Sequence, residues 1–127
     1  MTVLIDTSVI VDHLRGDKRA VRLLEELFGS ENGAYAATPT RTEIIAGLRP
    51  HEREPMARLF ALLSWIDIDT AIADAAGALA RRYRAAHQGI DTTDYHIAAA
   101  AQSIGARLIT LNVKHFPMFP DLEPAYR

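Results

Sequence analysis

Short apolar runs alternate along this chain with segments of helical periodicity, and this alternation constrains the fold more than any other feature. Val3–Ile5 is apolar, and Leu108–Leu111 is uncharged and apolar except for Thr110, which is typical of strands buried on both faces of a parallel sheet. Segments 34–37 and 65–69 predict two weaker strands. Strand–helix alternation predicts a parallel sheet between two layers of helices. We therefore predict a single three-layer α/β domain over residues 1–127, with four or five strands.

Six segments carry the apolar spacing of amphipathic helices. Their expected bounds are 7–14, 17–28, 40–48, 55–63, 70–83 and 92–104. Small polar residues precede them and are expected to cap their N-termini. The expected caps are Thr7 or Ser8, Asp17, Thr40, Thr70, and Asp91 or Thr92. The helix at 70–83 is expected to bury Ile72, Ala75, Ala76, Leu79 and Tyr83.

The composition is that of a globular domain with one core. The chain has 127 residues, of which 49% are hydrophobic and 24% are charged. No apolar run reaches the roughly 18–20 residues that span a membrane, and the N-terminus meets an acid at Asp6, so we expect neither a membrane segment nor a signal peptide. Cysteine is absent, which predicts a cytoplasmic protein without disulfides or thiolate metal sites.

The charge balance is ambiguous about a nucleic-acid partner. The net charge is −2 and the pI is about 6.2, whereas nucleic-acid-binding domains often have a pI above roughly 9. Of the 14 basic residues, however, only Lys18 and Lys114 are lysines. Arginine binds phosphate through two parallel hydrogen bonds. The alternative is that abundant arginine and alanine reflect genome composition.

Four acidic residues lie at predicted junctions between a strand or turn and the helix that follows it. They are Asp6, Glu43, Asp91 and Asp94. Carboxylates at the C-terminal ends of parallel strands point into the crevice where open α/β sheets bind ligands. Two carboxylates about 4 Å apart repel by roughly 4 kcal/mol at an effective dielectric near 20, and a divalent cation removes that cost. The pattern predicts a metal-dependent enzyme that acts on phosphate esters.

Each acid also has a purely structural interpretation as a helix cap. Asp6 can be an N-cap, although Thr7 or Ser8 can fill that place equally well. Glu43 stands three residues after Thr40, as in a capping box, and Asp94 stands three residues after Asp91. We favour a site role for Asp6, Asp94 and Glu43, and leave Asp91 as a cap or a helper.

Other polar residues are weaker candidates. Asn112 follows the last predicted strand, and its amide oxygen can bind a metal or a water. The five histidines do not pair at metal-ligand spacing, so we expect them to be structural. The chain has no phosphate-binding loop, no Gly-rich dinucleotide turn and no nucleophile elbow.

Four motifs together resemble the PIN domain and, more narrowly, the VapC toxins of bacterial toxin–antitoxin pairs. They are Val3–Ser8 (VLIDTS), Thr42–Leu48 (TEIIAGL), Asp94–Ala101 (DYHIAAAA) and Leu108–Asn112 (LITLN). The resemblance covers nearly the whole chain. Each motif alone is weak, but the four in this order are fairly specific.

The resemblance implies a Mg²⁺- or Mn²⁺-dependent endoribonuclease, usually homodimeric and inhibited by a VapB antitoxin. The family's three acids fall on Asp6, Glu43 and Asp94. Many members carry a fourth acid where this chain has Asn112, and Asp91 is a candidate for that charge. The acid often found before the Phe of the following loop is replaced by His115.

The expected reaction is hydrolysis of an RNA phosphodiester bond in a tRNA or rRNA, leaving a 5′-phosphate and a 3′-hydroxyl. Thr7, Ser8 and Thr110 are expected to position water or phosphate, and Arg41 and Arg49 to hold the RNA backbone.

Two alternatives remain open. The first is a PIN-like interaction module without catalysis. The second is an aspartate-based phosphatase, which needs a second Asp where Ser8 stands. For partner contacts, the candidates are Met118, Phe119 and segment 60–65, although ordinary core is the favoured interpretation of Phe60 and Trp65.

Overall fold

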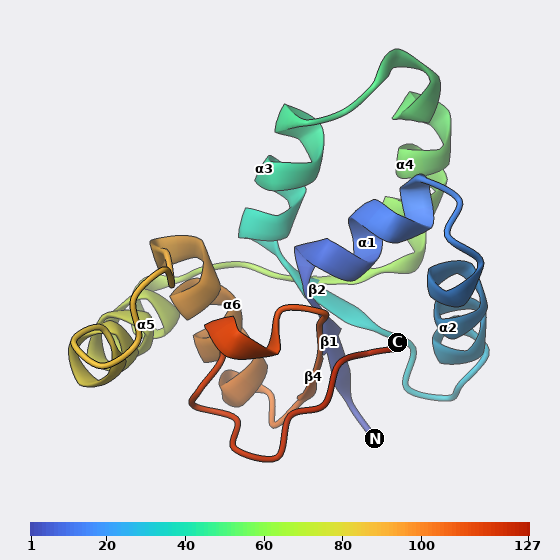
Figure 1. Cartoon of the computed structure of the whole chain (residues 1–127). Helices are drawn as coiled ribbons and strands as arrows, with labels where there is room; N and C mark the ends of the chain where they lie inside the picture. The colour runs from blue at the N-terminus through green and yellow to red at the C-terminus, as the bar shows by residue number, and fades with distance from the viewer.

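The computed structural model describes residues 1–127 as alternating strands and helices around one sheet (Figure 1). The four strands are β1 (Val3–Ile5), β2 (Tyr35–Ala37), β3 (Ser64–Ile66) and β4 (Arg107–Ile109). The six α-helices are α1 (Thr7–Leu14), α2 (Lys18–Phe28), α3 (Thr38–Ala46), α4 (Arg53–Leu62), α5 (Thr70–Tyr83) and α6 (Thr92–Ser103). Two 3₁₀ helices complete the set, η1 (Pro50–Glu52) and η2 (Val113–His115). No helix is long and apolar enough to cross a membrane.

All strand pairs are parallel, and the sheet has the order β3-β2-β1-β4. Leu4 of β1 pairs with Tyr35 of β2 on one side and with Leu108 of β4 on the other. The chain therefore builds outward from β1 through β2 and β3, and then crosses back to place β4 on the opposite side of β1. Open α/β sheets bind ligands beside such a reversal, outside the carboxyl ends of the strands.

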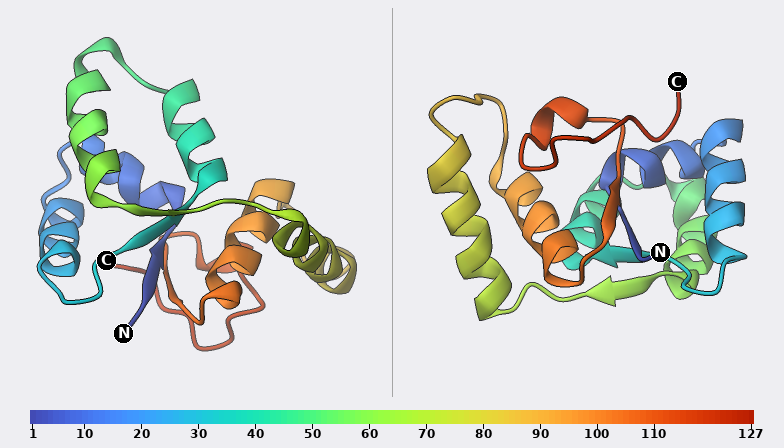
Figure 2. Two further views of the ribbon diagram at one scale, coloured as in Figure 1. Left: turned by 180° about the vertical axis from the view of Figure 1, so that it is seen from behind. Right: turned by 90° about the horizontal axis from the view of Figure 1, so that it is seen from below.

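Side chains alternate between two cores on opposite faces of the sheet. Leu4 and Leu108 pack with α5 and α6, whereas Ile5 and Ile109 pack with α1 to α4. Figure 2 shows the α5–α6 pair and the α1–α4 group on opposite sides of the strands. This is the predicted three-layer architecture, with four strands. The apolar character of both β1 and β4 follows from burial on both faces.

An alanine run brings α6 close to the sheet. Ala98, Ala99, Ala100 and Ala101 are each at most 2% exposed. Their small side chains allow the helix backbone to approach its neighbours closely. Gly105 has a φ of +62°, a conformation that glycine adopts without steric cost, and it turns the chain from α6 into β4. The run therefore fixes the position of the first residues of α6 relative to the strand ends.

The structure corrects several expected helix ends. Helix α3 begins at Thr38, with Pro39 in its first turn and Ala37 at the N-cap position, so the predicted capping box of Thr40 and Glu43 is wrong. Proline favours the first turn of a helix because it lacks the N–H that would be unsatisfied there. The N-cap of α5 is Asp69, not Thr70, and the Asp69 carboxylate accepts a 2.9 Å hydrogen bond from the Ile72 N–H.

Two expectations about buried side chains also change. Ala75 is exposed, but the other predicted residues of α5 face the core: Ile72 and Ala76 are buried, and Leu79 and Tyr83 are half-buried against it. Phe60 and Met118 are 6% and 8% exposed, which confirms ordinary core for Phe60 and removes Met118 from the candidate partner surface.

Candidate active site

Asp6 directly follows β1, the strand that lies between β2 and β4. Its backbone N–H continues the β1–β4 ladder with a 2.8 Å hydrogen bond to the Ile109 carbonyl. Asp6 occupies the N-cap position of α1, but its side chain makes no capping bond. The cap expected from Thr7 or Ser8 is also absent, since both belong to α1 itself. The carboxylate is therefore available for another role at the strand reversal.

Two hydroxyl groups hold one oxygen of the Asp6 carboxylate. Oδ2 accepts a 2.7 Å hydrogen bond from Thr110 and a 3.0 Å bond from Ser8. The Ser8 oxygen in turn accepts from the Leu111 N–H at 3.2 Å. Asp6 is 3% exposed, so its charge is desolvated except toward the site. No protein group donates to the second oxygen, Oδ1.

Glu43 reaches the same region from the second turn of α3. Its Oε1 accepts a 2.6 Å hydrogen bond from the Thr7 hydroxyl at the start of α1. The Thr7 oxygen also lies 3.0 Å from the hydroxyl of Thr40, which is fully buried. The structure thus assigns Glu43 a contact with α1 rather than a cap on its own helix. Its Oε2 has no donor within the protein.

Asp94 and Asp91 form a capping box at the start of α6. The Asp91 carboxylate accepts from the Asp94 N–H at 3.0 Å, and Oδ2 of Asp94 accepts from the Asp91 N–H at 3.2 Å. The same Oδ2 lies 3.2 Å from Nδ1 of His115 in η2. Asp94 keeps its second oxygen, Oδ1, free of protein donors.

The environment of Asp94 disfavours its negative charge. Burial, and then the charges of Asp91 and Asp6, raise the pKa of Asp94 to about 6. The Asp91 N–H and His115 act in the opposite direction but do not compensate. A positive charge placed among these carboxylates would stabilise the ionised form of Asp94.

These side chains line one pocket of about 220 Å³, and all eight lining residues are polar. They are Asp6, Thr7, Ser8, Glu43, Asp91, Asp94, Asn112 and His115. The predicted acids are thus brought to one place from β1, α3 and α6. Each is anchored through a single oxygen, and each keeps the other free. Such an arrangement presents preoriented anionic oxygens to a ligand.

The oxygen-rich lining fits a hydrated divalent cation. No three acidic or histidine side chains lie close enough to coordinate one ion together in this arrangement. Mg²⁺ is typically bound by one or two carboxylates together with retained waters and substrate phosphate oxygens. Asp6, Asp94 and Glu43 supply free oxygens for this mode of binding, and Asn112 adds a neutral polar group at the rim.

Some expected residues lie elsewhere. Thr110 is fully buried and supports Asp6 from behind without lining the pocket. The Arg41 guanidinium lies over the rings of Phe60 and Trp65, 4.6 and 4.8 Å from their centroids. Neither Arg41 nor Arg49 lines the pocket, so their contact with RNA stays a prediction.

His115 is the site residue that the scattered histidine pattern does not reveal. Its sequence signal is its place three residues after Asn112, in the loop that follows β4. Only the fold of η2 shows that this loop bends back toward α6.

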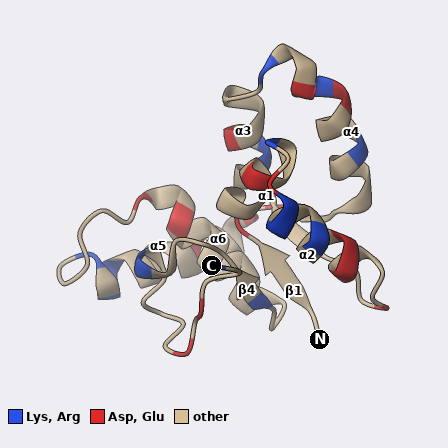
Figure 3. Ribbon diagram, turned by 45° about the vertical axis from the view of Figure 1, so that its right-hand side comes forward, with Lys and Arg blue, Asp and Glu red and all other residues tan.

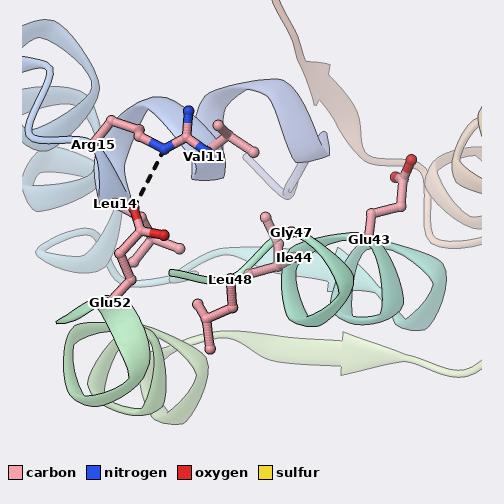
Figure 4. A pocket seen from close by; sticks show the side chains of 8 residues that line it. All are labelled: Val11, Leu14, Arg15, Glu43, Ile44, Gly47, Leu48 and Glu52. Carbon is pink, nitrogen blue, oxygen red and sulfur yellow. Dashed lines mark hydrogen bonds and ion pairs between the residues drawn. The ribbon is translucent and has the colours of Figure 1, made fainter. Parts of the chain in front are cut away.

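A smaller pocket of about 50 Å³ lies beside the site between α1, α3 and η1 (Figure 4). Buried Glu52 there accepts hydrogen bonds from the Arg49 N–H at 2.9 Å and from Arg15 Nε at 3.3 Å. These partners hold the pKa of Glu52 below its usual value, the Arg49 N–H having the larger effect. Figure 4 shows Glu43 at the far end of this pocket, with its carboxylate directed away from the Arg15–Glu52 pair. The charges of Glu52 and Arg15 satisfy each other and do not belong to the acidic pocket.

Known proteins resemble this chain over almost its full length. Ribonuclease VapC19 of Mycobacterium tuberculosis is 47% identical over 123 residues, which cover 97% of this chain and 98% of the relative. Ribonuclease VapC10 of the same organism is 39% identical over 125 residues, covering 98% and 92%. Residues 3–117 match the PIN domain family. The chain belongs to the VapC family of PIN-domain proteins.

Solved structures agree with this VapC assignment in fold. A toxin–antitoxin complex from Klebsiella pneumoniae contains a chain with a TM-score of 0.82 and 25% identity, with 99% of both chains covered. VapBC2 from Rickettsia felis, bound to a DNA fragment from its promoter, gives a TM-score of 0.80 at 20% identity, with 96% of both chains covered. The predicted family and the predicted PIN-like fold are both confirmed.

Proposed function

We propose that this VapC-family protein is the toxin of a toxin–antitoxin pair, and that it is a Mg²⁺-dependent endoribonuclease in which Mn²⁺ can substitute. The observation that carries the proposal is the set of free carboxylate oxygens of Asp6, Glu43 and Asp94 in one all-polar pocket. The names of the VapC19 and VapC10 relatives, both called ribonucleases, support RNA as the substrate.

The three acids differ in exposure, and we propose that they therefore differ in their contribution to binding the ion. Asp6 and Asp94 are the more enclosed and would be its principal ligands, with Glu43 completing the site from the exposed side. A divalent cation there would lower the pKa of a water and neutralise charge on the scissile phosphate. The chain's own contribution is orientation, because Ser8, Thr110 and Thr7 fix the carboxylates before substrate arrives.

The proposed reaction is hydrolysis in which water attacks the phosphorus in line and the bond to the 3′ oxygen breaks. It leaves a 5′-phosphate and a 3′-hydroxyl. Water as the nucleophile needs no ribose 2′-hydroxyl, so selection of RNA rests on shape and on contacts with the sugar. We propose a tRNA or rRNA as the target.

We also propose a VapB-type antitoxin as inhibitor and a homodimer as the working form. The toxin–antitoxin complexes among the similar solved structures support the first of these partners. The family resemblance of the four sequence motifs supports the second.

The test is cleavage of RNA in Mg²⁺ by the purified protein, with mapping of new 5′-phosphate ends. Asp6→Asn and Asp94→Asn should each abolish cleavage, because each removes one anionic ligand. Asp74→Asn, an exposed substitution on α5 outside the acidic pocket, is the matched control and should cut normally. Full activity in both pocket variants would contradict the proposal.

Calorimetric titration with Mn²⁺ separates the enzyme from an inactive interaction module. We expect wild type to bind Mn²⁺ more tightly than Asp6→Ala. Equal binding by the two proteins, together with absent cleavage, would favour the inactive module.

A further inference from the structure

The acidic pocket repels the substrate that we propose for it. Asp6, Glu43, Asp91 and Asp94 carry four negative charges when ionised, and His115 is the only basic side chain that lines the pocket. RNA carries one negative charge per phosphate, and cationic side chains supply most of the attraction in nucleic-acid binding. A single divalent cation would not balance the four carboxylates. Attraction for RNA must therefore come from cations close by.

The view in Figure 3 shows no face made of basic segments alone. Figure 3 shows acidic and basic segments interleaved over the helices rather than gathered on separate sides. The net charge of the chain is −2. Any cationic contact to the substrate is therefore local, and the pockets that adjoin the acidic one are the places to find it.

Two larger pockets adjoin the acidic pocket on different sides. One, of about 310 Å³, shares Glu43 and is lined by three threonines together with Pro39, Ile68 and His96, without lysine or arginine. The other, of about 500 Å³, lies between η2 and the C-terminal tail and shares Asn112 and His115. Lys114 and Arg127 line it, and Glu123 is its single acid. We call this second pocket the basic pocket.

The position of Arg127 is set by the residues before it in the tail. The Ala125 N–H donates a 2.8 Å hydrogen bond to the carbonyl of Thr110, the residue whose hydroxyl holds Asp6. The Tyr126 hydroxyl donates to Asp12 Oδ2 at 2.7 Å, and the Arg19 guanidinium lies 4.8 Å from the centre of the Tyr126 ring. The tail is thus tied to β4, α1 and α2, and Arg127 is brought beside the site.

Both cations of the basic pocket are exposed and accessible to a ligand. Lys114 is exposed and forms no ion pair within the chain. Arg127 pairs with Glu123 at 2.8 Å, with side chains 78% and 74% exposed. An ion pair this exposed is screened by solvent and contributes little, so a phosphate can displace it.

We infer that the basic pocket is a phosphate-binding subsite, in which Lys114 and Arg127 hold an RNA phosphate adjoining the one positioned at Asp6 and Asp94. Asn112 and His115 form the shared wall between the two pockets. The RNA backbone then follows a path from the acidic pocket along η2 toward the C-terminal tail. This inference rests on the proposed ribonuclease function and names part of its substrate contact.

The first experiment measures binding alone. Fluorescence anisotropy with a labelled single-stranded RNA oligonucleotide of mixed sequence, at low salt with chelator present, keeps the RNA intact whether or not the protein cuts it. Lys114→Gln and Arg127→Gln should each weaken binding severalfold. Each should also reduce the slope of log Kd against log salt by about 0.7, the value for one lost contact to single-stranded phosphate. Lys114→Arg should restore the slope.

Two further variants sharpen the test. Glu123→Gln should tighten RNA binding, because it releases Arg127 and removes the one acid of the pocket. Arg53→Gln removes an exposed cation at the start of α4 that lines neither pocket, and it should leave affinity and salt slope unchanged. Equal slopes for wild type and the Lys114→Gln/Arg127→Gln double variant, or no RNA binding by wild type, would overturn the inference.

A second experiment, RNA cleavage in Mg²⁺, separates failure of the subsite from failure of the proposed function. If the inference holds, the double variant raises KM severalfold and leaves kcat within twofold of wild type. Cleavage by the double variant with unchanged KM would contradict the phosphate-binding subsite but support the ribonuclease function. Salt-dependent RNA binding through Lys114 and Arg127 without any cleavage would support the subsite but contradict the ribonuclease function.

Discussion

The hydroxyl of Thr110 donates a 2.7 Å hydrogen bond to Oδ2 of Asp6, although 104 positions separate the two residues in the chain. Thr110 follows β4 and Asp6 follows β1, and the two strands are parallel neighbours. The bond is fully buried. The bond therefore links the C-terminal ends of the first and last strands through the side chain of Asp6, the proposed catalytic carboxylate.

Thr110→Val should lower both stability and activity. It removes one of two donors to a buried carboxylate, which costs about 1–3 kcal/mol of unfolding free energy. Loss of a group that orients a metal ligand costs roughly 10- to 100-fold in activity or metal affinity. Urea unfolding and RNA cleavage measure the two effects. Thr110→Ser keeps the donor and should stay close to wild type. A loss in Thr110→Ser with none in Thr110→Val would mean that packing of the methyl group matters instead of the hydrogen bond.

The Thr7–Glu43 bond should matter for catalysis more than for stability. Both side chains are partly or largely exposed, so Thr7→Val should change the unfolding free energy by less than about 1 kcal/mol. Because the Glu43 carboxylate is no longer oriented in this variant, kcat should fall on the order of tenfold. Thr7→Ser retains the hydroxyl and serves as the control. A Thr7→Val enzyme with wild-type kcat would contradict the proposal that Thr7 orients Glu43 for catalysis.

The stability of the metal-free protein should respond to the ionisation of Asp94. Its pKa is raised from 3.8 to about 6 by burial first, so between these values the folded state binds more protons than the unfolded state. Stability therefore falls as pH rises through this window and stays lowered above it. Asp94→Asn removes the buried charge and should raise the unfolding free energy near pH 8, measured by urea unfolding, by on the order of 1 kcal/mol. Near pH 4 the two proteins should be alike, and a constant difference at both pH values would contradict this.

Enlarging the alanine run of α6 should destabilise the fold. Ala100 is fully buried against the sheet side of the helix, and Ala100→Leu adds three carbon atoms to a filled space. Overpacking of this kind costs about 1–3 kcal/mol, and it should also displace Asp94 at the start of the same helix. Gln102→Leu makes an equally apolar change at an exposed position and should be nearly neutral. Thermal unfolding of the two variants checks the difference.

Arg41 should contribute to stability rather than to RNA binding. Its guanidinium stacks over Phe60 and Trp65, and an exposed cation–π contact is worth about 0.5–1 kcal/mol. Arg41→Ala should lose that amount in urea unfolding and keep the RNA affinity of wild type. Weaker RNA binding at unchanged stability would instead support the contact with RNA predicted from the sequence.

Local patterns in the sequence were sufficient for the elements and for the positions of the acids. Apolar spacing depends on residues a few positions apart, so it located β1, α2, α5 and α6 to within a few residues. The same local view placed Asp6 after a buried strand and Asp91 and Asp94 in a capping box. It failed at α3, where Pro39 starts the helix earlier than the polar residues after it suggested.

The tertiary structure decided which distant side chains meet. Thr110 with Asp6, Thr7 with Glu43, and His115 with Asp94 are contacts between different elements. None follows from periodicity, because each depends on the strand order β3-β2-β1-β4 and on the bend of η2 toward α6. The sequence by itself therefore determined the kinds of element and the charged groups at their ends. Only the tertiary structure determined which of these groups line one pocket with His115 and Asn112, since parallel strands bring all their carboxyl ends to the same edge of the sheet and the loop after β4 returns to that edge.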